Sequence, residues 1–168
     1  MRERHAWWAA HRAREFEAFV AGAGGRLLHA ATLLTAEPPD DNPHARRLLT
    51  LALAHTYACW HRTSGEDPYD HARQYLATRF ARGSWHRYGG RGRTRPHPAP
   101  GPLAVLTPQE RLVLVLRVYD GVAEEQTAAL LGLSTDRVRA LCDRATRRLL
   151  HPPRGRTSAV GGTKAAPS

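Results

Sequence analysis

A helix-turn-helix pattern over residues 107–149 constrains the fold of this chain more than any other feature. Thr107 can cap a helix, Pro108 suits its first position, and Glu110 can reach back to complete a capping box. The dipeptide Asp120-Gly121 favours a turn, because glycine tolerates positive φ. The sequence therefore predicts a helix that starts at Thr107 and ends at this turn.

Two more helices are predicted after the turn. Residues 124–131 form a short apolar helix that ends at Gly132, a residue typical of helix C-termini. Ser134 or Thr135 can cap the last helix. Its apolar residues recur at helical spacing and predict a buried face made of Val138, Leu141, Ala145 and Leu149.

Arginines occupy the other faces of the last helix. Residues 134–150 hold five arginines against two acids, net +3, whereas residues 107–133 hold two arginines against four acids, net −2. In a helix-turn-helix unit the start of the second helix reaches base edges, and later residues contact phosphates. The candidate base-reading residues are Thr135, Asp136, Arg137 and Arg139, and the candidate phosphate-binding residues are Arg144, Arg147 and Arg148. The alternative interpretation is a helical hairpin with a solvated basic face.

The first half predicts a helical domain over residues 1–82. Apolar residues keep a helical period from Phe16 to Leu34, a proline-rich loop follows, and a second helix is predicted over residues 44–60. Asp67-Pro68 starts a third helix. We therefore expect an all-α chain of two small domains. The expected boundaries are a first domain over 1–82, a flexible Gly/Pro/Arg-rich linker over 83–106, a second domain over 107–151 and a disordered basic tail over 152–168.

The net charge of +10 indicates a polyanionic partner, although much of the excess lies in the predicted linker and tail. We expect a cytoplasmic protein, because no apolar stretch is long enough for a signal peptide or membrane span. Cys59 and Cys142 lie in different domains and fit reduced thiols.

No catalytic constellation or phosphate loop is present, so the sequence predicts neither an enzyme nor a cofactor. His55 and Cys59 are four residues apart on one helix, and His61 is close by in the sequence. No second pair at ligand spacing completes a tetrahedral site, so no metal centre is expected.

Residues 106–145, with the runs Leu-Thr-Pro-Gln-Glu-Arg, Gln-Thr-Ala-Ala-Leu-Leu-Gly-Leu-Ser and Val-Arg-Ala-Leu-Cys-Asp-Arg-Ala, resemble region 4 of extracytoplasmic-function (ECF) sigma factors of bacterial RNA polymerase. In that family region 4 reads the upstream promoter element. Residues 15–20, 31–35, 52–60 and 67–69 resemble region 2 of the same family, in its actinobacterial type.

The resemblance implies further sites in the first half. The third helix and the loop before it would read the downstream promoter element, through Arg73, Arg79 and Arg82. The start of the second helix would bind RNA polymerase core, through Arg46, Arg47, Leu48 and Thr50. At the start of the second helix, members of the family carry acidic residues that contact arginines of the polymerase. This chain has Arg46 and Arg47 there, so the same contact would bring like charges together and be unfavourable.

Three hypotheses follow. The first is an ECF-type sigma factor that binds duplex promoter DNA and recruits polymerase core, with an anti-sigma factor as a further candidate partner. The second is a sigma-derived helix-turn-helix regulator that no longer recruits polymerase. The third is a protein-interaction module that binds another sigma factor or an anti-sigma factor.

Overall fold

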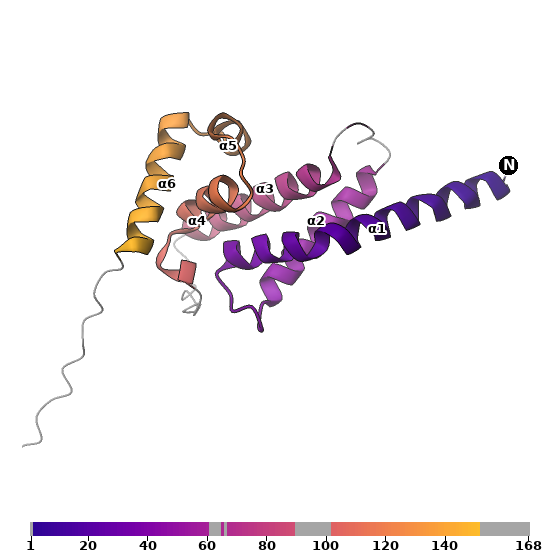
Figure 1. Cartoon of the computed structure of the whole chain (residues 1–168), viewed down its shortest axis with the longest axis horizontal. Helices are drawn as coiled ribbons and strands as arrows, with labels where there is room; N and C mark the ends of the chain where they lie inside the picture. The colour runs from indigo at the N-terminus through magenta and orange to yellow at the C-terminus, as the bar shows by residue number, and fades with distance from the viewer. Residues whose placement is uncertain (1, 61–64, 66, 90–101, 152–168) are drawn as a thin grey trace, which may run out of the picture.

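A computed structural model describes residues 2–60, 65, 67–89 and 102–151 of the chain (Figure 1). Every regular element in these ranges is helical, which confirms the all-α prediction. None of the described helices combines the length and apolar character that a membrane crossing requires. In chain order the elements are α1 (Arg2–Thr35), α2 (Pro43–Cys59), α3 (Pro68–Gly89), η1 (Pro102–Val105), α4 (Pro108–Leu114), η2 (Val115–Tyr119), α5 (Glu124–Leu131) and α6 (Thr135–Leu150).

Helices α1, α2 and α3 form the N-terminal unit, in which α2 packs against both of the others. The periodic apolar face of α1 is buried as expected, with Leu27 and Leu34 almost completely covered. Phe16 packs its ring against Tyr57 and Trp60 of the α2 end, at centroid distances of 4.9 and 5.2 Å. The start of α1 projects beyond the other helices (Figure 1).

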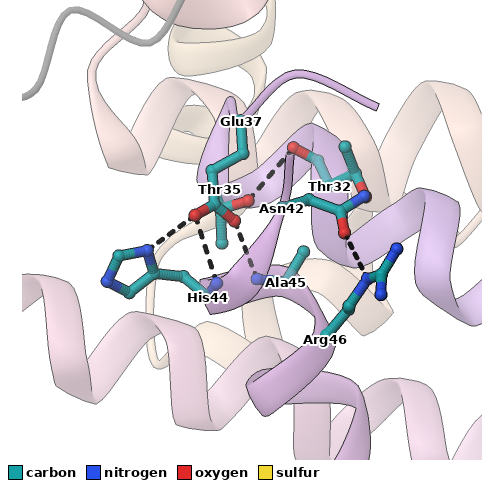
Figure 2. A network of polar contacts seen from close by, with 7 residues as sticks. All are labelled: Thr32, Thr35, Glu37, Asn42, His44, Ala45 and Arg46. Atoms are coloured by element: carbon teal, nitrogen blue, oxygen red, sulfur yellow. Dashed lines mark hydrogen bonds and ion pairs between the residues drawn. The ribbon is translucent and has the colours of Figure 1, made fainter. Parts of the chain in front are cut away.

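The N-terminus of α2 is capped by a residue from the preceding loop. One carboxylate oxygen of Glu37 accepts hydrogen bonds from the backbone N–H of His44, at 3.1 Å, and contacts its ring at 2.6 Å. The other accepts from the backbone N–H of Ala45 at 2.8 Å (Figure 2). Asn42, the residue before the helix, instead bonds to Thr32 and accepts from Nε of Arg46. Glu37 thus satisfies N–H groups that the helix itself leaves without partners.

The C-terminal unit contains the predicted helix-turn-helix. The capping box is present, because the Thr107 hydroxyl accepts from the N–H of Glu110, and Glu110 accepts from the N–H of Thr107 at 2.9 Å. Gly121 and Gly132 both have positive φ, 67° and 65°, as their predicted turn and capping positions require. Ser134, rather than Thr135, caps α6. The sequence did not predict the π-helical turn of η2 that precedes Gly121.

The buried side chain of Glu110 also connects two helices of the C-terminal unit. Its side chain is 1% exposed, and its Oε2 atom lies 2.7 Å from Nη1 of Arg148 near the end of α6. The same carboxylate oxygen accepts from the N–H of Thr107. One carboxylate therefore ties the start of α4 to the last turn of α6.

The structure differs from the predicted linker at both ends. Helix α3 continues to Gly89, so the first residues of the expected 83–106 linker are helical. At the other end, η1 packs on α6, and Leu103 and Leu106 are buried in the core. The C-terminal unit therefore begins near residue 102, because these leucines cover apolar surface that α4 and α6 leave open. Residues 90–101 and the predicted tail, 152–168, lie outside the described ranges.

Replacing Glu37 with glutamine tests the cap of α2. Burial raises the pKa of Glu37, but hydrogen bonds from Ala45 and His44 outweigh it and hold the pKa below its ordinary value of 4.5. The ionised side chain therefore stabilises the fold above that value, and this contribution is lost as the pH falls through the folded-state pKa. Glu37→Gln is expected to lower the free energy of unfolding by about 1 kcal/mol at neutral pH. Chemical denaturation at several pH values measures this effect. The difference in the free energy of unfolding between Glu37→Gln and the native chain should become smaller as the pH falls, and a difference independent of pH would contradict the prediction.

Arg148→Ala should destabilise the C-terminal unit, because the buried carboxylate of Glu110 loses its cationic partner. The Arg148 side chain is 44% exposed, so water replaces part of that interaction, and we expect a loss of about 1–3 kcal/mol in the free energy of unfolding. Arg144→Ala is the matched control on the same helix, and this exposed residue should change stability by less than about 0.5 kcal/mol. Equal stability of the two variants would show that the ion pair contributes nothing.

Candidate nucleic-acid interface

Helix α6 separates a buried face from a charged face. Val138, Leu141 and Ala145 are at most 2% exposed, and Leu149 packs against the same core, which confirms the predicted stripe. The polar residues project to the opposite side. Those exposed to solvent are Asp136, Arg137, Arg139, Asp143, Arg144, Thr146, Arg147 and Arg148.

Among the candidate base-reading residues, Arg137 is one of two cations. Its side chain is exposed and makes no ion pair with the described residues. Asp136 is also exposed, and Thr135 is half-buried at the first position of α6. Arg139 is different, because its guanidinium lies 2.6 Å from Glu124 of α5 and 3.3 Å from Asp136. A contact between Arg139 and a base would have to replace these ion pairs.

The candidate phosphate-binding residues also divide into two kinds. Arg144 is exposed without an ion pair in the described structure, and Arg147 donates only to the carbonyl of Asp143 in its own helix. Both can turn toward a phosphate at little cost. Arg148 is held by buried Glu110, so its first role is structural.

On α3, Arg79 and Arg82 are exposed, but Arg73 is not. The Arg73 side chain is 14% exposed and pairs with Asp70 at 3.0 Å. It lines a cleft between α3 and α5, with Gln126 and Leu130 on the opposite wall. Arg73 can reach DNA only if α5 moves away from α3.

At the start of α2, Arg46, Arg47 and Thr50 are exposed. Arg46 donates through Nε to Asn42 at 2.9 Å, whereas Arg47 makes no ion pair with the described residues. The prediction of a polymerase contact by Leu48 is not supported, because this side chain is 9% exposed and belongs to the core. Its position on the inner face of α2 explains the difference.

A buried carboxylate joins the two units. Asp120 follows η2 and its side chain is 1% exposed. It accepts a hydrogen bond from the Tyr69 hydroxyl of α3 at 2.8 Å and lies 3.8 Å from Nη2 of Arg26 of α1. The Arg26 guanidinium covers the Tyr69 ring, and Tyr119 donates to the Arg26 carbonyl.

The protonation of Tyr69 reflects this environment. Burial, the hydrogen bond to Asp120 and the Asp120 charge raise the pKa of Tyr69, while Arg26 lowers it. Tyr69 therefore stays a hydrogen-bond donor across the physiological range. Sequence reasoning missed this contact, because Tyr69 and Asp120 are 51 residues apart and each also suits a local role at a helix start or a turn.

The N-terminal unit also gathers three residues with metal-ligating side chains. Ligand atoms of His55, Cys59 and His71 all lie within 4.8 Å of one another. The sequence suggested the first two by their spacing, but His71 comes from α3, and only the packing of α2 on α3 reveals it. His61 lies outside the described residues. Within the described ranges neither cysteine forms a disulfide.

Comparisons with known proteins agree with this arrangement. A family model described as sigma-70, region 4, matches residues 103–151. The chain is 30% identical over 154 residues to the RNA polymerase sigma-E factor of Streptomyces coelicolor, with 80% of this chain and 84% of the relative covered. It is 29% identical over 154 residues to the RNA polymerase sigma-E factor of Streptomyces avermitilis, with 80% and 83% covered. No solved structure matches significantly.

The region 4 match coincides with the unit formed by η1 and the helix-turn-helix, and the similarity to the two sigma factors covers 80% of the chain, so it reaches beyond this unit into the N-terminal half. The chain therefore belongs to the RNA polymerase sigma factors of the actinobacterial ECF type, which act in transcription initiation.

Proposed function

We propose that this sigma factor reads an upstream promoter element with the N-terminal half of α6 and brings polymerase core to that promoter. The observation that carries the proposal is that Arg137, beside Asp136 at the capped start of α6, is exposed and makes no ion pair with any residue that the structure describes. In helix-turn-helix proteins this position faces base edges in the major groove. Arginine there can donate two hydrogen bonds to one guanine.

Residues around this position would divide the work of binding. Arg144 and Arg147 would contact phosphates, which fix the register of the helix without reading sequence. Arg139 would contact a base only after it breaks its ion pairs with Glu124 and Asp136. Exposed Arg79 and Arg82 on α3 are proposed to contact the downstream element.

For polymerase core, the proposed surface is the exposed start of α2, with Arg46, Arg47 and Thr50. The nearby carboxylate of Glu37 is turned into the fold, where it caps the helix. It therefore does little to offset the two arginines at the surface. In the family, an acidic run at this place contacts arginines of the polymerase. The two arginines of this chain would instead be complemented by an acidic patch on the polymerase.

The packing of the two units implies a closed form that must open. Arg73 faces α5 in the closed form, and Asp120 is buried against α1 and α3. Promoter binding by both units at once requires them to separate, which breaks the contacts of Asp120. An anti-sigma protein that bound α3 and α5 together would hold this closed form and oppose both activities. Nothing in the comparisons favours a regulator without polymerase or a pure interaction module.

The first test compares Arg137→Ala with Arg147→Ala on α6. Duplex DNA selected by the native chain from a randomised library provides the preferred site. Arg137→Ala should cost about 1–3 kcal/mol of binding free energy on that site and little on random DNA. Arg147→Ala should weaken both equally and lower the salt dependence by about one released counterion. Fluorescence anisotropy at several salt concentrations measures both effects, and equal losses for Arg137→Ala on the two DNAs would make it a phosphate contact.

The second test opens the closed form by Tyr69→Phe, which removes the hydroxyl that donates to Asp120. A hydrogen bond to a charged acceptor contributes about 1.5–3 kcal/mol, so the open population should rise roughly 10-fold or more. Affinity for the preferred DNA and for polymerase core should rise with it, and small-angle scattering should show a larger radius of gyration. Tyr57→Phe is the control, since the described contacts of Tyr57 are made by its ring. If Tyr69→Phe lowers the stability of the chain but leaves its affinities for DNA and polymerase core unchanged, then a closed form does not limit binding and the proposal is contradicted.

A further inference from the structure

Two helices of the N-terminal unit bring their ends together at a cluster of nitrogen and sulfur atoms. His55 and Cys59 are one helical turn apart, so they share a face of α2, and Cys59 is its last residue. His71 lies in the first turn of α3. All three side chains are partly covered by the fold rather than fully solvated. The cluster therefore sits where α2 ends and α3 begins.

We propose that His55, Cys59 and His71 form a Zn²⁺ site, with water as the fourth ligand. Two imidazole nitrogens and one thiolate are a donor set typical of zinc, which accepts nitrogen and sulfur in tetrahedral geometry. Three protein ligands with one open position is a known arrangement for this ion.

The spacing of the donor atoms fits this ion. Sγ of Cys59 lies 3.9 Å from Nε2 of His55, and the ligand atoms of all three residues lie within 4.8 Å of one another. Around a tetrahedral zinc, nitrogen and sulfur ligands are about 3.3–3.6 Å apart, given bonds of about 2.0–2.3 Å. Side-chain rotations therefore suffice to close the site, and the helices need not move apart.

A second observation points to a missing ligand at the same place. Nε2 of His71 is buried and has no hydrogen-bond partner among the described residues. A buried polar atom without a partner is uncommon and is often explained by an ion or water. A metal ion, or the water bound to it, would satisfy this nitrogen.

Stacking orders the two histidine rings, but each imidazole nitrogen binds an ion in the plane of its own ring, so one of the two parallel rings must turn before both bind the same ion. The His55 ring stacks on Tyr75 at a centroid distance of 4.2 Å and lies nearly parallel to the His71 ring, at 5° and 5.3 Å. Tyr75 would thus act as a positioning residue and not as a ligand. Zinc bound here would fix the end of α2 to the start of α3, on either side of the segment that joins them.

The experiment uses the full chain without a histidine tag, freed of metal by a chelator and titrated with Co²⁺ under reducing conditions. One equivalent should produce a thiolate-to-cobalt charge-transfer band and the visible bands of tetrahedral cobalt, and Zn²⁺ should displace both. Cys59→Ser should abolish the charge-transfer band, whereas Cys142→Ser, on α6, should leave it unchanged. His71→Gln should weaken zinc affinity more than roughly 100-fold, because even residues that only orient ligands change it 10–100-fold. His11→Gln, at an exposed site on α1, is its control.

X-ray absorption at the zinc edge provides a readout that does not depend on the variants. It should report one sulfur and three nitrogen or oxygen neighbours in the native chain. Absence of a stoichiometric charge-transfer band, a band that follows Cys142, or zinc affinity unchanged in His71→Gln would each overturn the site. If circular dichroism shows that a variant misfolds, the X-ray absorption spectrum of the native protein still tests the site. A zinc coordination shell without sulfur would refute the proposal.

Discussion

The buried carboxylate of Glu110 is the interaction on which the DNA-binding unit depends. It completes the cap of α4 through Thr107 and meets Arg148 at the far end of α6, so one charge fixes two helices that are distant in sequence. A unit of this size has a small core and needs such a constraint, because little apolar area is available to orient its helices. The direction in which α6 presents Arg137 therefore depends on a residue that does not touch DNA.

A second buried carboxylate, that of Asp120, connects the C-terminal unit to the N-terminal unit. Its partners, Tyr69 and Arg26, come from two different helices of the N-terminal unit. A carboxylate that is 1% exposed is stable only while these partners remain. Once the units separate, however, water can solvate Asp120 fully. The contact can therefore hold the closed form and still be reversible, as the proposed binding of two promoter elements requires.

Local patterns predicted much of the fold from the sequence. The capping box at Thr107 and the turn at Gly121 were confirmed because each depends on neighbouring residues alone. The contacts that decide accessibility were not predictable in this way. The resemblance placed Leu48 on a surface, although it shares a face of α2 with Ala45 and Ala52 that packing buries. Arg73 becomes covered only when α5 lies against α3. The cluster of His55, Cys59 and His71 likewise could not be predicted, because the packing of two helices supplies His71.

The arginines show why charge alone assigns no function. On α6, Arg137 and Arg139 look equivalent in the sequence, yet Arg139 is paired with Glu124 at 2.6 Å, and Arg137 has no such partner within the described part of the chain. An arginine that must exchange an ion pair for a base gains only the difference between the two interactions. It can therefore discriminate between sequences without adding much affinity, because only a well-matched base compensates for the broken pair. An unpaired arginine such as Arg144 gains affinity from any phosphate. Under the proposed function, specificity in this helix thus depends on the acids that surround its arginines as much as on the arginines themselves.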